Sequence, residues 1–288
     1  VLVLEMSKML ERFPKMFSVT RATELLLPKL PAHLNLLRMV AAQSRNFQTA
    51  NDVDTPFPQW VFLGAPGVGK GTYSTRVAKA LGVSHIAAGD LVREEIKKGT
   101  TRGKQMQAAA SQGQLISDSA IFELMQEKFE ENAARGIRGF VLDGFPRTAA
   151  QATRLQENLT IDLAVNLSLR EEVLVEKCLG RRVCSKCKRS WNLAEINLPA
   201  SDGRPAIFMP PLNPPEECLE HLQTREDDTE EVIRRRLQVY RAEAEPVEQF
   251  YRERGLLLDF EITAGIPETL PRLIATLAEA SGREISPE

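Results

Sequence analysis

The chain has 288 residues, and its hydrophobic fraction of 43% and charged fraction of 26% are those of an ordinary globular protein with a sizeable core. Its formal net charge of −2 excludes an overall basic field, so phosphate recognition must come from local cations and no nucleic-acid-binding surface is indicated. No apolar run is long enough to span a bilayer, and four cysteines in a chain of this length do not make a disulfide framework.

The N-terminal segment differs from the rest of the chain. Residues 6–50 contain seven basic and two acidic residues, with leucine, methionine and phenylalanine scattered among them. An arginine-rich, acid-poor, amphipathic segment is typical of an organelle transit peptide, so we assign residues 1–51 to such a leader. A mitochondrion is the first choice of compartment and a plastid the second. The alternative is a helical extension docked on the domain, which the prolines of the segment disfavour because they break it into short pieces.

A glycine-rich motif follows the leader. The apolar run 59–63 predicts a buried strand, GAPGVGKGT occupies 64–72, and 73–82 has a helical pattern closed by glycine. Strand, turn and helix N-terminus together form an anion cradle, because glycine lets backbone N–H groups turn inward around a phosphate. Lys70 can reach the β- and γ-phosphates of a nucleotide, so the motif predicts a nucleoside triphosphate site and not a turn without ligand. The Ser or Thr that holds Mg²⁺ usually follows the lysine directly, whereas here Thr72 comes one position later.

Strand and helix signals alternate through the rest of the chain. The sequence predicts buried strands at 140–142, 163–169 and 256–260, and helices at 119–134, 171–180, 229–251 and 267–280. This alternation predicts an α/β fold with three layers, in which helices cover both faces of a central parallel sheet.

Three further motifs point to one family. AAGDLVR lies at 87–93, LDGFPRT at 142–148 with Gln151 close behind, and REDD at 225–228 before a helix bearing three consecutive arginines. With the glycine-rich motif, which also has the displaced threonine of that family, they resemble the adenylate kinases, which interconvert ATP, AMP and ADP. The resemblance covers residues 59–282.

The resemblance implies a domain organisation. It places a P-loop kinase domain at 52–282, with an AMP-binding helical segment at 88–119 and an inserted lid at 182–225, followed by a short tail at 283–288. A lid of this length is of the long type and disfavours the short-lid UMP/CMP kinases. The family default is a monomer.

Phosphoryl transfer explains the residue types in these motifs. It needs two phosphates held in line, their charge neutralised and water excluded, and no nucleophilic side chain. Arginine suits this work because its planar fork grips phosphate oxygens and stays charged. The resemblance implies that the catalytic residues are Lys70, Asp143, Arg147, Arg181, Arg225 and Arg236. Asp143 would orient Mg²⁺ through water, although at a strand end it could instead be a helix cap.

The resemblance also implies two substrate sites. The ATP site would consist of Gly64, Ala65, Pro66, Gly67, Val68, Gly69, Lys70, Gly71, Thr72, Lys177, Arg181 and Ile266. The AMP site would consist of Ala88, Arg93, Gln114, Ile116, Gly144, Phe145, Arg147, Gln151, Arg225 and Arg236. Within it, Arg93 and Arg147 would clamp the acceptor phosphate and Gln151 would hydrogen-bond the adenine.

Several positions keep two interpretations. Asp227 and Asp228 could cap the following helix or anchor lid arginines, and Arg234 and Arg235 could lie on a solvated face. Ala88 stands where the family usually has a hydroxyl, and Lys177 stands where an arginine usually stacks on adenine. Both departures leave open a GTP:AMP or other nucleoside monophosphate kinase. A catalytically silent nucleotide-binding subunit of a larger assembly is the remaining alternative, disfavoured by the intact set of cations.

The lid carries a candidate metal site. Cys184 and Cys187 are spaced as one half of a tetrahedral zinc site, and Cys218 and His221 as the other half. The resemblance raises the hypothesis of a structural Zn²⁺, because some adenylate kinases bind zinc at this point of the lid, although Pro215 stands at the family's third ligand position. The alternative is a lid packed by its own side chains with reduced thiols. Cys178 is predicted to be an ordinary buried thiol in the helix at 171–180.

Overall fold

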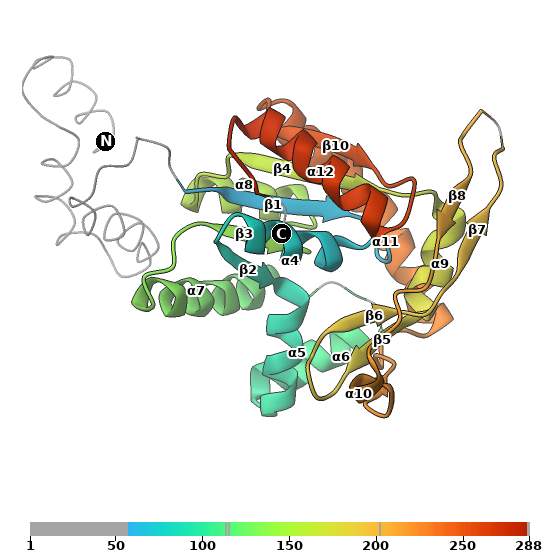
Figure 1. Ribbon diagram of the computed structural model, residues 1–288. Helices are drawn as coiled ribbons and strands as arrows, with labels where there is room; N and C mark the ends of the chain where they lie inside the picture. The colour runs from blue at the N-terminus through green and yellow to red at the C-terminus, as the bar shows by residue number, and fades with distance from the viewer. Residues whose placement is uncertain (1–56, 113, 115, 202, 287–288) are drawn as a thin grey trace, which may run out of the picture. The chain divides into compact units, whose positions relative to one another are not determined.

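The computed structural model describes residues 57–112, 114, 116–201 and 203–286 (Figure 1). The predicted leader lies outside these residues. The centre of the molecule is a five-stranded sheet with the order β10-β4-β1-β3-β2. Its strands are β1 (Gln59–Gly64), β2 (Ser84–Ala87), β3 (Phe140–Asp143), β4 (Leu163–Ser168) and β10 (Leu257–Glu261). All neighbouring strands pair in parallel, as predicted.

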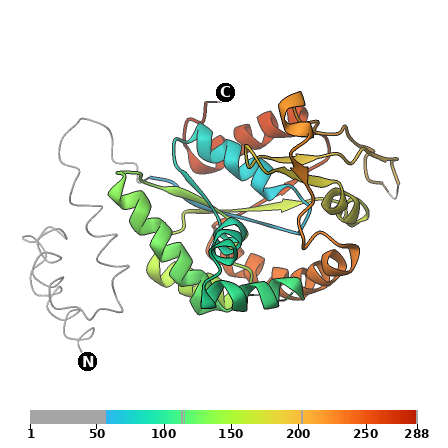
Figure 2. The same cartoon turned by 90° about the horizontal axis from the view of Figure 1, so that it is seen from below.

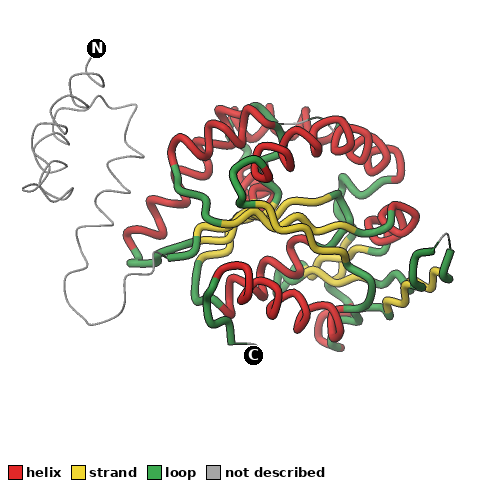
Figure 3. The backbone as a smooth tube through the Cα atoms, turned by 90° about the horizontal axis from the view of Figure 1, so that it is seen from above, coloured by secondary structure: helices red, strands yellow, loops and turns green. Residues whose placement is uncertain are grey.

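Helices cover both faces of this sheet. The described residues form the helices α4 (Lys70–Ala80), α5 (Ala88–Lys98), α6 (Thr101–Ser111), α7 (Asp118–Ala134), α8 (Ala149–Asn158), α9 (Glu171–Leu179), α10 (Glu216–Leu219), α11 (Glu230–Arg252) and α12 (Ile266–Ser281). Figure 2 shows α4 in cyan and α12 in red on one side of the sheet and α7 in green on the other. Figure 3 shows the same three layers from the opposite side.

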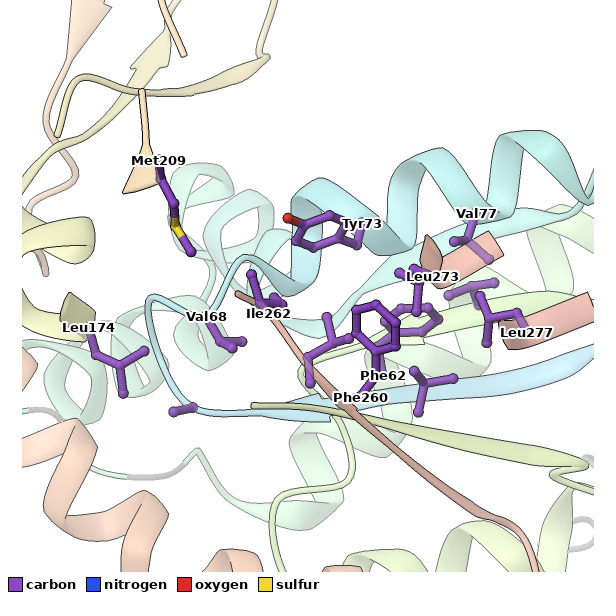
Figure 4. Close-up of a cluster of buried hydrophobic side chains, with 14 of the residues drawn as sticks. Phe62, Val68, Tyr73, Val77, Leu174, Met209, Phe260, Ile262, Leu273 and Leu277 are labelled. Carbon is purple, nitrogen blue, oxygen red and sulfur yellow. The ribbon is translucent and has the colours of Figure 1, made fainter. Parts of the chain in front are cut away.

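The apolar sequence of β1 explains why helices pack on both faces of the sheet. Five consecutive residues of this strand are buried, which is possible only when both faces of a strand are packed. Phe62 points into a cluster with Val77 of α4 and Leu273 of α12 (Figure 4). The alternate residues Val61 and Leu63 are buried outside that cluster. The predicted three-layer α/β fold is therefore confirmed.

Threonine side chains cap the helices that follow the functional motifs. Thr148 accepts a hydrogen bond from the Gln151 amide at 3.2 Å at the start of α8, and Thr229 accepts one from the Val232 amide at 3.4 Å at the start of α11. Asp143 and Asp228 therefore do not serve as caps of these helices, and their carboxylates remain available for the site.

The predicted lid has two parts. β5 (Arg181–Cys184), β6 (Ser190–Asn192) and β9 (Leu222–Gln223) form a small antiparallel sheet. The hairpin of β7 (Ile196–Leu198) and β8 (Ile207–Met209) instead joins the core, because Ile196, Ile207 and Met209 are buried in the cluster of Phe62. No helix of the described residues is long and apolar enough to cross a membrane.

Candidate functional site

The functional motifs meet at one edge of the sheet. The glycine-rich loop leaves the carboxyl end of β1, Ala88 follows β2 directly, and Asp143 ends β3. Because these strands are parallel neighbours, their carboxyl ends lie together, which is where open α/β sheets bind ligands.

The glycine-rich loop is shaped by close packing and by the next helix. Gly67 has φ of +86°, and a Cβ there would lie 2.6 Å from the Leu174 carbonyl oxygen and 2.8 Å from the Cys178 sulfur, so a larger residue does not fit. Gly69 precedes α4 in a left-handed conformation and has no side chain to cap the first N–H groups of the helix. These donors and the positive end of the helix dipole are thus available to an anion.

Lys70 lies inside this loop. Its Nζ donates to the carbonyl oxygens of Gly64 and Ala65, at 2.6 and 2.9 Å. Burial lowers the pKa of Lys70 to about 8, the nearby Asp143 carboxylate opposes this shift, and Arg147 and Arg236 reinforce it. The ammonium group therefore lies where an anionic ligand would stabilise its charge.

Two of the predicted arginines are held by the aspartate pair of the REDD motif. Arg181 donates to both carboxylate oxygens of Asp228, through Nε at 2.8 Å and through Nη2. Arg236 contacts Asp227 at 3.0 Å. Burial opposes the charge of Arg181, but the hydrogen bond and charge of Asp228 outweigh it and raise the pKa. The aspartates therefore anchor arginines, one of the two roles predicted for them.

Arg225 has a different environment. Its Nε is buried and has no hydrogen-bond partner among the described residues. Burial, followed by the charges of Arg181 and Arg93, lowers its pKa to about 10. The charges of Asp90 and Asp228 oppose this shift without cancelling it. A half-buried cation with a desolvated, unpartnered Nε gains from an added anion, so this position fits a phosphate.

The predicted acceptor residues lie on α5 and around the end of β3. Arg93 pairs with Asp90 within α5, and the Nε of Arg147 donates to the Gly144 carbonyl oxygen at 2.7 Å. The side-chain oxygen of Gln151 accepts from the Arg147 amide at 2.7 Å, and its nitrogen donates to Asp118 at 2.6 Å. Asp118 was not predicted, because its partner lies 33 residues away and only the fold joins them.

Four other predicted acceptor residues are buried or peripheral. Ala88 and Phe145 are buried, and Phe145 packs edge-on against Phe122 of α7. Gln114 is exposed and Ile116 half-buried in the connection between α6 and α7. No hydrogen bond joins either side chain to the other acceptor residues in the described part of the chain.

Asp143 lies against the first turn of α4. A Cβ on Gly71 would be 3.1 Å from its Oδ2, and that oxygen lies 3.9 Å from Nε2 of His85. The same nitrogen of His85 is hydrogen-bonded to Ser74 at 2.9 Å, and burial lowers the pKa of His85 against the pull of Asp143. The Asp143 carboxylate and the Thr72 hydroxyl are oxygen donors of the kind that Mg²⁺ prefers.

Met209, which was not predicted from the sequence, lies next to the residues predicted to bind the base of ATP. Lys177 on α9 approaches the sulfur of Met209 at 3.5 Å, and burial lowers the pKa of Lys177. Met209 extends from the β7–β8 hairpin toward Val68 and Ile262 (Figure 4). Phe208 bridges to Ala264, two residues before the predicted ATP residue Ile266 at the start of α12. The hairpin thus lines the region predicted for the ATP base.

Three of the four predicted zinc ligands come together. The sulfur atoms of Cys184, Cys187 and Cys218 all lie within 4.8 Å of one another, and those of Cys187 and Cys218 are 3.6 Å apart. Among the described residues no histidine or carboxylate completes this group, so His221 does not take the position predicted for it. Zinc itself stays a prediction. Cys178 is buried in α9, as predicted.

Comparison with known proteins gives one consistent family. A family model described as adenylate kinase matches residues 62–256. A chloroplastic adenylate kinase 1 of Arabidopsis thaliana is 52% identical over 219 residues, 76% of this chain and 77% of the relative. An adenylate kinase of Solanum tuberosum is 50% identical over 229 residues, 80% of each chain. A GTP:AMP phosphotransferase of Plasmodium falciparum is 37% identical over 212 residues, 72% of this chain and 90% of the relative.

The matched residues include the loop around Lys70, the end of β3 with Asp143 and Arg147, and the segment from Arg181 to Arg225. The parallel sheet and its P-loop agree with the fold that the sequence motifs imply. The chain therefore belongs to the adenylate kinase family and is a phosphotransferase.

Proposed function

We propose that the protein catalyses reversible phosphoryl transfer from MgATP to AMP, giving two ADP. The observation that carries this proposal is the group of cations at the carboxyl edge of the sheet, in which the half-buried Arg225 has a buried Nε without a hydrogen-bond partner among the described residues. Two substrate phosphates would supply the missing negative charge. Their in-line placement, together with the field of these cations, is what phosphoryl transfer requires.

On the donor side, the nine residues of the P-loop, 64–72, would enclose the ATP phosphates. Lys70 would exchange its carbonyl contacts for the β- and γ-phosphates, and Arg181 would approach from the lid. Lys177 and the backbone near Ile266 would flank the adenine. Asp143, with Thr72 nearby, would hold Mg²⁺, which neutralises charge on the transferring phosphates.

On the acceptor side, Arg93 and Arg147 would clamp the AMP phosphate, with Arg225 and Arg236 closing over it. Gly144, Phe145 and Gln151 would place the base together with Ala88, Gln114 and Ile116. Gln151 retains hydrogen-bonding capacity for adenine, because each end of its amide can form a second bond beside those to Arg147 and Asp118.

The domain assignments support a closing motion. We assign residues 88–119 to acceptor binding and 182–225 to a lid that excludes water when both substrates are bound. The small sheet of β5, β6 and β9 carries Arg181 at its start, and Arg225 follows its last strand. The protein acts as a monomer in this proposal, because one chain supplies all the residues named.

For the cysteine cluster we restrict the zinc proposal to three thiolates, Cys184, Cys187 and Cys218, since sulfur is a preferred donor for zinc. The fourth position would fall to water or to a rearranged His221. The metal would brace the lid and take no part in the transfer. One zinc per purified chain, lost in Cys218→Ser, is the expected result, and a metal-free wild type contradicts it.

For the compartment we propose a plastid. Two relatives that are about half identical to this chain carry the name chloroplastic, and the leader has a transit-peptide composition. The mitochondrion, first choice on composition alone, gains no support from these relatives. Residues 1–51 fused to a fluorescent protein should enter isolated chloroplasts, and import into mitochondria alone would contradict the assignment.

The second candidate is GTP:AMP phosphotransfer. It is favoured by Lys177 in place of a stacking arginine, by Ala88 in place of a hydroxyl, and by the similarity to the Plasmodium protein of that name. These residues surround the predicted bases and leave the cations unchanged, so they affect the choice of nucleotide and not the chemistry.

One assay separates the candidates. The purified full chain receives ATP or GTP with Mg²⁺ as donor, and AMP, GMP, CMP or UMP as acceptor, and each product is quantified. Transfer from ATP to AMP is the expected result. Transfer from GTP to AMP would favour the second candidate, and no transfer from either donor while ATP still binds would indicate the catalytically silent subunit.

A further inference from the structure

An ion-pair network outside the predicted site joins three helices. Its centre is Glu95 of α5, whose side chain is only 4% exposed. Its carboxylate accepts from Thr100 Oγ1 at 2.7 Å, from Arg102 Nε at 3.1 Å and from Lys98 Nζ at 3.4 Å. The hydrogen bonds from Arg102 and then Thr100 lower the pKa of Glu95 to about 2.

Arg102 extends the network from α6 to α7. Its Nη1 lies 3.0 Å from Glu127 and 3.3 Å from Glu123, and its Nη2 lies 3.4 Å from Glu127. One guanidinium therefore connects a buried carboxylate on α5 with two carboxylates on α7. Arginine can do so because its planar fork presents several donors in fixed directions, whereas lysine offers a single charged nitrogen.

The helices α5 and α6 approach each other closely at this point. A Cβ on Gly103 would lie 2.4 Å from the Glu95 carbonyl oxygen, and Thr100 caps α6 by accepting from the Gly103 amide at 2.9 Å. The two helices therefore form one packed unit, which contacts α7 directly through α5 and is also tied to α7 by the ion pairs of Arg102.

The helices that Arg102 connects, α5 and α7, both carry residues linked to the proposed acceptor site. Arg93, one of the two proposed phosphate clamps, lies on α5 two residues before Glu95. The other clamp, Arg147, is bonded through its amide to Gln151, which is bonded to Asp118 at the start of α7. We propose that Arg102 is a positioning residue that fixes α5 against α7 and thereby sets the placement of Arg93 relative to Arg147.

The proposal rests on the proposed function, and it predicts a selective effect. Without Arg102 the buried Glu95 loses a charged partner, and the α5–α6 unit loses its attachment to the exposed carboxylates of α7. Arg93 is then held less firmly relative to Arg147 in the proposed AMP site, whereas the positions of the P-loop and Lys177 do not change. A selective rise in the KM for AMP follows, with the KM for ATP unchanged.

The test compares Arg102→Leu, Arg102→Lys and Glu127→Gln with the wild type. As a matched control, Arg135→Leu removes an exposed arginine that pairs with Glu131 within α7. We expect Arg102→Leu to raise the KM for AMP by roughly three- to tenfold with kcat within about twofold. Arg102→Lys should be intermediate, because one ammonium cannot reach both helices. The control should match the wild type.

Two further measurements make the result decisive. The difference between wild type and Glu127→Gln should shrink at high salt, because ions screen exposed pairs. Glu127→Gln removes only an exposed carboxylate, so it tests the attachment even if Arg102→Leu does not fold. Unchanged KM for AMP in Arg102→Lys and Glu127→Gln, or an equal rise for ATP and AMP, would overturn the proposal. A wild type that phosphorylates no monophosphate would instead refute the proposed function.

Discussion

Lys70 and Arg225 show how far single residues depart from their ordinary chemistry. Each is a cation in an environment that disfavours its charge, with pKa values lowered to about 8 and about 10. Burial is the first cause in both cases, and neighbouring arginines add to it. A bound anion stabilises these unfavourable charges. The site thereby gains affinity for phosphate, while the same charges lower the free energy of unfolding of the ligand-free protein.

The lowered pKa of Lys70 predicts a pH dependence of ATP binding. Bound phosphate favours the ammonium and raises the pKa, so above pH 8 binding takes up a proton. We expect the affinity to be constant well below this pH and to fall by roughly tenfold per unit above it. Calorimetry in two buffers of different ionisation enthalpy measures the proton uptake, and identical heats in both buffers above pH 8 would contradict the assignment.

Replacement of Arg225 should separate stability from activity. Arg225→Leu removes a half-buried cation whose buried Nε has no hydrogen-bond partner among the described residues, so we expect the midpoint of thermal unfolding to stay the same or rise. The rate of phosphoryl transfer should fall by about a hundredfold or more, because the cation acts on the transferring charge. Arg234→Leu is the matched control, since Arg234 is exposed and pairs with Glu230, and both quantities should stay near wild type. A lower midpoint for Arg225→Leu would show that the residue is structural.

Among the elements, the β7–β8 hairpin differs most from the sequence-based expectation. The family resemblance assigns residues 182–225 to an inserted lid, yet Ile196, Ile207 and Met209 belong to the core cluster. The hairpin therefore contributes both to the stability of the kinase domain and to the region of the donor base.

Truncation of Met209 tests both contributions. Met209→Ala should lower the free energy of unfolding by about 2–5 kcal/mol, as large-to-small changes in a core do. It should also raise the KM for ATP and leave the KM for AMP unchanged, because Met209 lies against Lys177. Phe208→Ala, at a neighbouring side chain that is 55% exposed, should change the stability little. A normal KM for ATP in Met209→Ala would remove the hairpin from the donor site.

The elements also show what sequence alone can supply. The strands β1 and β4 consist mostly of apolar residues and were predicted near their observed ends. The strand β2 was missed because Ser84 and His85 interrupt its apolar pattern over only four residues. The helices α5 and α6 lie within the helical segment at 88–119 that the family resemblance implied, without separate bounds for each helix. The helix α8 was missed as an element, although Gln151 within it was noted as a binding residue.

The same limit applies to the site. The glycine-rich loop and the REDD pair are local in sequence, and the aspartates indeed hold the predicted arginines. The contacts of Gln151 with Asp118 and of Lys177 with Met209 join residues 33 and 32 positions apart. Tertiary packing sets such contacts, so a single sequence carries no signal for them.

At the scale of the whole molecule, the cations of the proposed site gather at the carboxyl edge of the central sheet. The free energy of unfolding should therefore rise when anionic ligands bind there. Ligands that bind only the folded state stabilise it by mass action, by about 2.7 kcal/mol at a hundredfold excess over Kd. We expect MgADP to raise the unfolding midpoint far more than adenosine at equal concentration, because the phosphates supply the charge. Equal shifts for the two ligands would mean that the base dominates binding.

The exposure of Cys187 offers a way to test the proposed closing motion of residues 182–225 directly. All four cysteines of the chain lie in its described part, and Cys187 is the exposed one. A maleimide fluorophore would attach there without any engineered cysteine and would sit on the small lid sheet. Its emission would report nucleotide-driven motion in real time, and the rate of its attachment would reveal whether a metal already occupies the sulfur.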